Sequence, residues 1–344
     1  MVIAAPHPAP DPAVLDQLVR VAGAAPSVHN TQPWRFRWDA RRAAMEVHVE
    51  PDRALPHMDP DGRELLISVG AAVFNLRVAV RHAGWEPVVH LLPDAGDPGL
   101  AASVQLTGRR AAHGRSRDTR LLRAALLRHS SRLPFTSGEI HPDVRRALVD
   151  AALDEGADLA FPDPAETRRL LILTRDAQAR ALADRERRAE TQAWVRGTPS
   201  GPRGPLGIPP ESLGARDSAG RLPMRDFAGA APGDPLPAAP RRLRQYPALF
   251  EPDPRIAVLA TPHDEPADRL RAGQALQHVL LEATASGLQT SMFTQALEWP
   301  DLRWALRDHR RGPGHVQMLI RLGHGARGPA SPRLPAAALL RPEA

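Results

Sequence analysis

The sequence predicts an α+β fold in which two half-domains are fused in one chain and a lid insertion interrupts the second of them. Three observations lead to this prediction. Helical stretches alternate with short strands, two of the helical stretches recur at constant offsets, and one long segment is dense in proline, glycine and arginine. The half-domains are expected at residues 11–120 and 121–330, with the insertion at residues 184–250.

The composition is that of a globular protein. Hydrophobic residues make up 42 % of the 344 residues, which is enough for a sizeable core. No stretch reaches the roughly 18 uninterrupted apolar residues of a membrane span, and residues 1–12 lack the basic start and apolar stretch of a signal peptide. We therefore expect a soluble protein of the cytoplasm that has no membrane partner.

Two residue types are absent from the sequence. Without cysteine there are no disulfides, thiolate metal sites or cysteine nucleophiles, and without lysine there is no Schiff-base lysine or P-loop. The 14 histidines show no spacing typical of a metal site, so no metal is expected. The net charge of +6 is spread along the chain without a basic-aromatic cluster. It indicates a solvated surface or attraction for an anionic cofactor, and not a nucleic-acid interface.

The first half-domain is expected to begin with a helix. Asp11 can cap this helix, Pro12 suits its first turn, and apolar residues recur at helical spacing up to Pro26. Asp61 and Glu64 resemble a capping box that opens a second, almost wholly apolar helix running to residue 84. Alternating segments predict strands at residues 35–38, 45–50 and 88–92.

Both helices recur in the second half. Residues 11–22 align with residues 141–152 at an offset of 130, and residues 70–84 align with residues 273–287 at an offset of 203. The second half therefore holds about 73 additional residues between these landmarks. The match is degenerate, and helices rich in alanine and leucine also align by chance, so duplication and coincidence both stay open at this point.

The additional residues coincide with a change in composition. Residues 184–195 predict a charged helix, and residues 197–240 are dense in proline, glycine and arginine without periodicity. Such a segment is typical of a lid or of a surface loop, and Trp194, Arg225 and Phe227 are candidates for anchoring a lid. Further strands are predicted at residues 256–260, 291–294 and 316–322.

The strongest local motif lies at residues 26–34, after the first helix and before the first strand. Ser27, Asn30 and Gln32 offer hydroxyl and amide groups that can bond to the edge of a planar heterocycle. The alternative interpretation is structural, since serine and asparagine also terminate helices and Trp34 can pack in the core.

A second motif lies at residues 128–132, after a predicted apolar helix. Arg128 and Arg132 are spaced i and i+4 around His129 and Ser130, and guanidinium and hydroxyl groups both donate to phosphate oxygens. The motif therefore suggests a phosphate cradle. Because arginine is abundant throughout this chain, a plain surface cluster is the alternative.

Together the two motifs resemble the nitroreductase family, and in particular its actinobacterial Acg-like branch of FMN-binding proteins. Residues 27–34 resemble the family's Ser-x-x-Asn-x-Gln-Pro-Trp motif, and residues 128–132 resemble its Arg-His-Ser-x-basic phosphate motif. Residues 283–295 resemble the segment that leads to the flavin-facing loop, and residues 318–325 resemble the terminal strand. The resemblance covers residues 11–330.

The resemblance implies a nitroreductase-like fold and a role for each motif residue. FMN would lie between the two halves, with hydride arriving and leaving at flavin N5 and no catalytic side chain needed for that step. Arg132 would lie beside flavin N1 and the C2 carbonyl, where reduced flavin develops negative charge. The other cofactor-binding residues would be Ser27, Asn30 and Gln32 at the ribityl chain and ring, Arg128, His129 and Ser130 at the phosphate with Arg327 or Arg333 as helpers, and Thr294 and Gln295 near N5.

Each motif occurs once, so one composite site is expected, and residues 27–32 and 128–132 must then share a pocket. The resemblance implies an FMN-dependent oxidoreductase that passes hydride from NAD(P)H to a small electron-poor acceptor, a nitro compound or a quinone. The alternatives are a flavin-sequestering protein with little turnover and a relic of the fold that binds no flavin. The chain is expected to be a monomer with an internal pseudo-dimer, or a homodimer.

Overall fold

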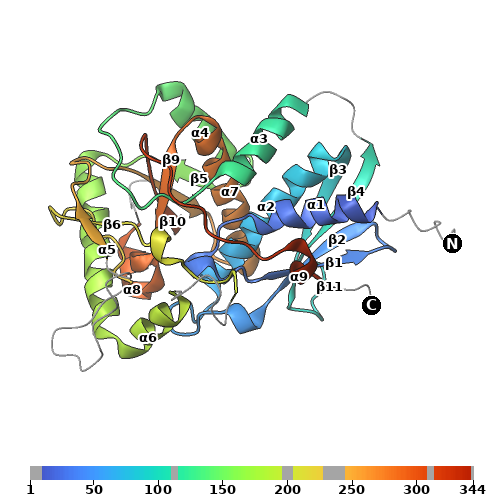
Figure 1. Cartoon of the computed structure of the whole chain (residues 1–344), viewed down its shortest axis with the longest axis horizontal. Helices are drawn as coiled ribbons and strands as arrows, with labels where there is room; N and C mark the ends of the chain where they lie inside the picture. Colours follow the sequence, from blue (N-terminus) through green and yellow to red (C-terminus); the bar gives the residue numbers. More distant parts are fainter. Residues whose placement is uncertain (1–9, 110–114, 196–203, 228–244, 308–313, 342–344) are drawn as a thin grey trace.

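The computed structural model describes residues 10–109, 115–195, 204–227, 245–307 and 314–341 (Figure 1). Two large sheets form in these residues, and two long helices, α2 (Arg63–His82) and α7 (Pro266–Ala285), lie side by side between them. The predicted α+β fold is therefore confirmed.

The first sheet has the strand order β11-β1-β2-β4-β3, and all neighbours are antiparallel except β1 and β11. In the first strand Trp34, Phe36 and Trp38 are buried and alternate with half-buried polar residues, which is the pattern of a strand with one face on the core. The strands are β1 (Trp34–Asp39), β2 (Ala44–Val49), β3 (Trp85–Leu91), β4 (Leu100–Arg109) and β11 (Leu340–Arg341).

The second sheet has the strand order β5-β8-β10-β9 and is antiparallel throughout. The strands predicted at residues 256–260, 291–294 and 316–322 are confirmed by β8, β9 and β10, whereas β4 and β5 are missed. The strands are β5 (Asp158–Ala160), β8 (Arg255–Thr261), β9 (Gln289–Phe293) and β10 (His315–Gly323), and a separate parallel pair consists of β6 (Ala215–Asp217) and β7 (Tyr246–Ala248).

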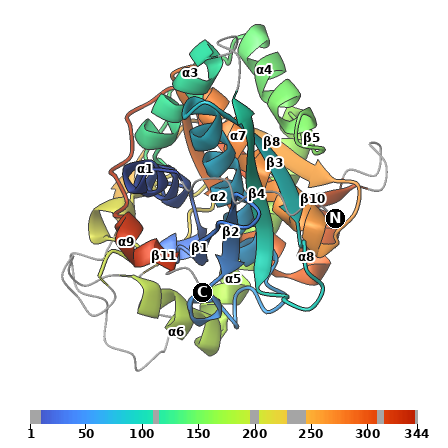
Figure 2. The same cartoon turned by 90° about the vertical axis from the view of Figure 1, so that its right-hand side faces the viewer.

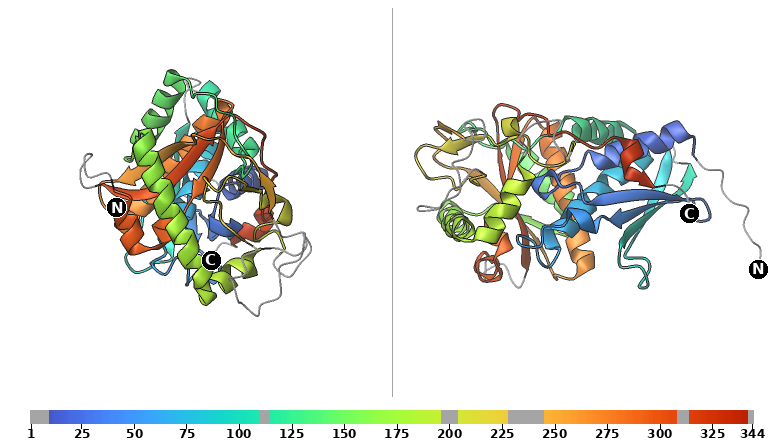
Figure 3. Two further views of the ribbon diagram at one scale, coloured as in Figure 1. Left: turned by 90° about the vertical axis from the view of Figure 1, so that its left-hand side faces the viewer. Right: turned by 60° about the horizontal axis from the view of Figure 1, so that its bottom comes forward.

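The remaining helices surround the sheets. Figure 3 shows α5 lying across the outer face of the second sheet. The C-terminal segment returns to the first half, where the buried Leu339 packs against Gly23 of α1 (Figure 2). These helices are α1 (Pro12–Gly23), α3 (Arg115–Leu127), α4 (Pro142–Leu153), α5 (Pro164–Ala183), α6 (Arg185–Trp194), α8 (Pro300–Ala305) and α9 (Ala336–Leu339), so the expected boundary at residue 120 falls inside α3.

The two halves repeat one order of elements. The bounds of α1 and α4 differ by 130 residues, and the bounds of α2 and α7 differ by 203, as in the sequence alignment. Each half runs helix, strand, strand, helix, strand, strand, and the order β1-β2-β4-β3 matches β5-β8-β10-β9. We infer that the halves are copies of one unit, with α5, α6, β6 and β7 added inside the second copy.

The two long helices touch through two glycines. A Cβ atom on Gly70 would lie 2.1 Å from the backbone oxygen of Leu270, and one on Gly273 would lie 2.1 Å from the backbone oxygen of Ile67. The contact is symmetric between the two helices, because Gly273 follows Gly70 by 203 residues and Leu270 follows Ile67 by the same number. Only a residue without a side chain allows backbones to approach this closely, so glycine is required at both positions.

The start of α2 differs from the sequence prediction. Gly62, with φ of 62°, precedes the helix, and the Asp59 carboxylate accepts hydrogen bonds from the backbone N–H groups of Glu64 (3.0 Å) and Leu65 (2.8 Å). The predicted capping box of Asp61 and Glu64 is therefore wrong, because the left-handed turn at Gly62 brings Asp59 over the helix end. The Glu64 side chain is left available for other contacts.

The second helix, α2, meets the length and hydropathy criteria of a membrane span. Its most apolar window is 78 % buried between the two halves, so these properties are explained by its position in the core of the protein. Two hydrophobic cores flank it, one under the first sheet with α1 and α3, and one under the second sheet with α4 and α5.

Replacing Gly70 with alanine is expected to lower the free energy of unfolding by about 3 kcal/mol, because the new methyl group overlaps a backbone oxygen of the facing helix. Equilibrium unfolding in denaturant measures the change. Gly138→Ala is the matched control, since its Cβ would meet nothing closer than 3.5 Å, and it should stay within about 0.5 kcal/mol of wild type. Equal destabilisation by both substitutions would contradict the close crossing.

Candidate functional site

Residues from both sequence motifs line one cavity of about 90 Å³, here called the central cavity. Its walls come from the loop after α1, the first turns of α2, the segment before α4, the end of β9 and part of the insertion. The shared pocket required of residues 27–32 and 128–132 is therefore present. The predicted site residues that line it are Ser27, Ser130, Arg132, Thr294 and Gln295.

The loop after α1 has a strained backbone. His29, Asn30 and Gln32 adopt φ values of 47°, 56° and 49°, in the left-handed region that non-glycine residues rarely occupy. The Ser27 hydroxyl accepts the N–H of Gln32 at 2.9 Å, and the buried Arg53 donates to the Gln32 carbonyl at 2.6 Å. These bonds stabilise a conformation that costs energy, which is typical of functional loops.

Asn30 and Gln32 do not line the central cavity. The Asn30 amide donates to the carbonyls of Pro205 (3.1 Å) and Gly207 (3.0 Å) in the insertion, and the Gln32 amide also donates to Pro205 (3.2 Å). The side-chain amide oxygen of Gln32, Oε1, accepts from the N–H of Leu334 at 2.9 Å. Both side chains therefore fasten the insertion and the C-terminal segment onto the loop.

The buried Arg128 and the half-buried Arg333 form a pair of cations, here called the arginine cluster. Arg128 is 4 % exposed, and its Nε and Nη1 atoms have no partner among the described residues. Burial and the charge of Arg333 lower the pKa of Arg128 to about 9, and burial lowers that of Arg333 to about 10. Arg333 donates to the Asn30 side chain at 2.7 Å, but its Nε also lacks a partner in the described part of the chain.

The buried Arg321 shows how this chain stabilises an arginine whose role is structural. Arg321 is fully buried, binds both carboxylate oxygens of Glu251 at 2.5 and 2.6 Å, and donates to the carbonyl of Leu133. Among the described residues, no carboxylate pairs with Arg128. Because a buried, unpaired guanidinium is costly, the arginine cluster fits an anionic ligand such as a phosphate group.

Arg132 lies at the edge of the central cavity under the insertion. It donates to the Ser212 carbonyl at 2.8 Å, and its guanidinium carbon lies 5.3 Å from the centre of the Phe227 ring. Burial and the nearby Arg225 lower the pKa of Arg132 to about 10. A desolvated cation in this position can stabilise negative charge on a ligand in the cavity.

His29 lines the same cavity, although the sequence analysis assigns it no role. Its ring is 6 % exposed, packs edge-on against Phe227, and has no partner at either nitrogen among the described residues. Burial, with the charges of Arg225 and Arg132, lowers the pKa of His29 well below its ordinary value. A neutral imidazole therefore offers one donor and one acceptor to a ligand.

The insertion is fixed to the loop after β9. Arg225 donates to the Thr294 hydroxyl at 3.0 Å and forms an ion pair with Glu298, whose carboxylate also accepts from Thr294 at 2.8 Å. The Gln295 amide donates to the carbonyl of Pro223 at 3.0 Å. Thr294 and Gln295 therefore lie in the cavity wall, and their side chains bind the insertion.

His129 and Arg327 lie farther out. Burial and the charges of Arg128, Arg327 and Arg333 lower the pKa of the half-buried His129. Arg327 is exposed and lines a separate, more open cavity of about 610 Å³ beside α3. The structure thus brings Arg333 to Arg128, while Arg327 stays at the surface.

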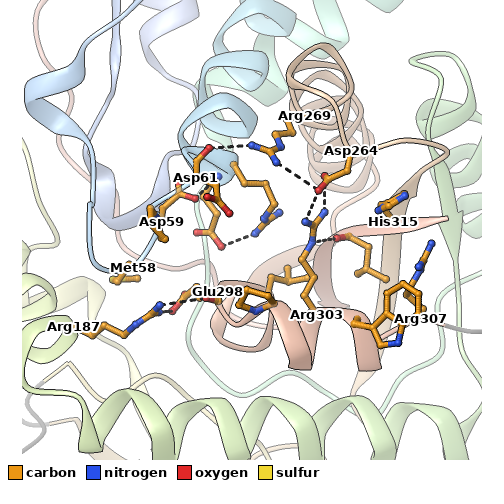
Figure 4. A pocket seen from close by; sticks show the side chains of 17 residues that line it. Met58, Asp59, Asp61, Arg187, Asp264, Arg269, Glu298, Arg303, Arg307 and His315 are labelled. Atoms are coloured by element: carbon orange, nitrogen blue, oxygen red, sulfur yellow. Dashed lines mark hydrogen bonds and ion pairs between the residues drawn. The ribbon is translucent and has the colours of Figure 1, made fainter. Parts of the chain in front are cut away.

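A second cavity of about 230 Å³, here called the charged cavity, is lined by acidic and basic side chains (Figure 4). Glu64 lines both this cavity and the central cavity. The sequence analysis treats Glu64 only as a capping residue. Glu64, Ser68 and Ala71 occupy positions i, i+4 and i+7, which share one face of a helix, and all three line the central cavity. This spacing could have indicated from the sequence that Glu64 faces the cavity.

Comparison with known proteins gives close relatives over nearly the whole chain. No family model matches the sequence. The Mycobacterium tuberculosis protein named "Putative NAD(P)H nitroreductase acg" is 31 % identical over 334 residues, which cover 94 % of this chain and 93 % of that protein. A second protein of that organism, named "Putative NAD(P)H nitroreductase Rv3131", is 32 % identical over 319 residues, which cover 91 % of this chain and 86 % of that protein. Among solved structures, a nitroreductase with bound FMN from Desulfitobacterium hafniense aligns with 63 % of this chain and 94 % of its own, at 16 % identity and a TM-score of 0.38.

Inorganic phosphate is expected to stabilise the ligand-free wild-type protein, by about 1.4 kcal/mol at ten times its Kd, and Arg128→Met should abolish this effect. Thermal unfolding with and without phosphate measures both. Arg128→Met should also leave the ligand-free protein as stable as wild type or more so, because it removes an unpaired buried charge.

Arg42→Met, at an exposed site, is the control for that substitution and should retain the response to phosphate. If phosphate stabilised the Arg128→Met protein as much as wild type, the arginine cluster would not be the anion site.

Proposed function

Because the chain belongs to the nitroreductase family, we propose that it is an FMN-dependent oxidoreductase that uses NAD(P)H to reduce a small electron-poor acceptor, a nitro compound or a quinone. One observation carries the proposal: the unpaired, buried Arg128 and the central cavity are joined by the short segment through Ser130 to Arg132. A phosphate group and a heterocyclic ring on one ligand would fit these two environments. Bound FMN would supply a two-electron carrier whose N5 accepts and donates hydride.

Different residues of this chain would bind the phosphate group and the ring of FMN. Arg128 and Arg333 would hold the phosphate, since guanidinium groups match phosphate oxygens in charge and geometry. Ser27, Ser130 and Arg132 would surround the ring, with the Arg132 charge stabilising negative charge that develops on reduction.

The insertion controls access in this proposal. The central cavity of about 90 Å³ is smaller than the roughly 300–1,000 Å³ of most ligand pockets, and Met224, Arg225 and Phe227 of the insertion form one wall. The described lid segment, residues 204–227, would have to withdraw before cofactor and substrate enter. We propose residues 184–250 as the lid and residues 11–120 and 121–330 as the two half-domains, acting in the cytoplasm as an internal pseudo-dimer or as a homodimer of such chains.

A second function, sequestration of flavin with little turnover, is favoured by the closed position of the lid. Arg225 is fixed to Thr294 and Glu298, and the amides of Asn30 and Gln32 hold residues 205–207 against the loop after α1. The two functions differ in how readily these contacts break.

The purified protein is expected to be yellow and to release FMN on denaturation. Under anaerobic conditions NADPH or NADH should bleach the flavin absorbance within seconds, and a quinone or nitroaromatic compound should restore it. Absorbance that stays unchanged over an hour would favour sequestration. A protein that remains colourless after FMN is added would contradict both flavin functions.

Arg225→Met is expected to accelerate reduction by NADPH about tenfold, because it removes an ion pair that holds the lid and thereby favours the open state by about 1.4 kcal/mol. Stopped-flow absorbance at saturating NADPH measures the rate. Arg175→Met is the control, since Arg175 also bonds the insertion, through the carbonyls of Gly220 and Arg221, but does not line the central cavity. Equal rates for all three proteins would show that lid opening does not limit reduction.

A further inference from the structure

Glu64 separates the central cavity from the charged cavity. It belongs to the first turn of α2, is 3 % exposed, and contributes to the lining of both cavities. The charged cavity (Figure 4) is also lined by the exposed residues Asp61 and Trp304, so it lies toward the surface, whereas the insertion forms one wall of the central cavity. A buried carboxyl group therefore lies between the charged cavity and the central cavity, the proposed site of reduction.

Charged groups from three elements face Glu64. Arg63 donates to one of its oxygens at 2.8 Å, Glu298 lies in the segment after β9, and Arg225 reaches in from the insertion. Asp59 is near too, although both its oxygens accept N–H groups at the start of α2. Burial, together with Glu298 and Asp59, raises the pKa of Glu64 to about 8 against the opposing effect of Arg63 and Arg225. This shift favours the protonated form of Glu64.

Glu298 adds an acceptor on the side of the charged cavity. Its Oε1 atom accepts hydrogen bonds from Thr294 and Arg225, while its buried Oε2 atom has no hydrogen-bond partner among the described residues. Glu298 also lines the charged cavity, where Figure 4 shows it beside Arg187. The Oε2 atom lies 3.9 Å from Nη1 of Arg187 and can still accept a hydrogen bond from water in the charged cavity.

We propose that Glu64 is a proton-relay residue, which takes protons from the charged cavity and delivers them to an acceptor that is reduced in the central cavity. The inference rests on the proposed function, because it names the proton source for that reaction. The combination that carries it is a single buried carboxyl group shared by two cavities, together with the unsatisfied Glu298 oxygen on the outer side.

The proton balance of quinone reduction defines the step. A quinone becomes a hydroquinone by gaining one hydride and one proton. NAD(P)H, with bound FMN as carrier, would supply the hydride, and the Glu64 carboxyl group would donate the proton to the quinone oxygen as its O–H bond forms. The resulting Glu64 carboxylate then regains a proton from water by way of the charged cavity.

Opening and closing of the lid would determine when Glu64 releases its proton. With the lid closed, the positive charge of Arg225 favours the ionised form of Glu64 and so favours release of its proton. With the lid open that charge withdraws, and Glu64 binds a proton more tightly. Closure over the acceptor would thus drive the proton inward, and opening would restore it.

The test is the rate at which 1,4-benzoquinone reoxidises the reduced, FMN-loaded protein. Glu64→Gln should slow this step by about 100-fold, the scale of general acid catalysis, and should remove the decline in rate that wild type shows above about pH 8. Reoxidation by ferricyanide, which takes electrons without protons, should remain within about twofold of wild type by the same reasoning. Equal slowing with both oxidants would overturn the proposal by showing a merely structural effect.

Asp61→Asn is the matched control, because Asp61 lies three residues away, lines the charged cavity alone and is exposed. It should leave both rates and the pH profile unchanged. If benzoquinone reoxidised the Glu64→Gln protein as fast as wild type, the relay would also be overturned. The proposed function would still stand as long as FMN is bound and reduced. Failure to bind or reduce FMN in wild type would instead refute the proposed function.

An infrared measurement keeps the proposal testable if Glu64→Gln does not fold. The wild-type protein at pH 7 should show the carbonyl stretch of a protonated carboxylic acid, lost as the pH rises through about 8. Glu64→Asp, which keeps the acid group but shortens its reach, should retain such a band and recover part of the benzoquinone rate. A wild-type spectrum without this band at neutral pH would contradict a proton held on Glu64.

Discussion

The backbone contact between α2 and α7 at Gly70 and Gly273 determines where the rest of the site lies. Because neither residue has a side chain, the two helices touch, and the first turns of α2 come to face residues from α7 and β9. The central cavity is built from both halves as a result. A wider crossing would separate Ser27 from Ser130 and Thr294 and leave no common pocket.

Uncompensated positive charge is the second organising feature. Within the part of the chain that the structure describes, no carboxylate pairs with Arg128, Arg132 or Arg333, in contrast to Arg321, which is paired with Glu251. The free-energy cost of desolvating these guanidinium groups can be offset by a bound anion. The arrangement of the arginines is therefore best explained by the anion they would bind. Acidic groups lie instead at the opposite edge, where Glu64 and Glu298 meet the charged cavity.

Sequence periodicity and two motifs were sufficient to predict much of this arrangement. The offsets of 130 and 203 residues predicted which helices correspond, and the alternating pattern of residues 35–38 predicted a strand. These features depend on local spacing, which the chain carries from one residue to the next. The short β5 and the capping of α2 by Asp59 were not predictable, because the first has too few residues for a pattern and the second depends on a turn at Gly62.

By itself, then, the sequence determined the fold class, the offsets that relate the helices of the two halves and the chemical character of the two motifs. Only the tertiary structure decided which motif residues face the cavity and which, like Asn30 and Gln32, hold the insertion. It also decided that Glu64 lines two cavities and that Arg128 lacks an anion. The physical reason is that burial, pairing and pKa depend on neighbours hundreds of residues away in the chain, which no local pattern records.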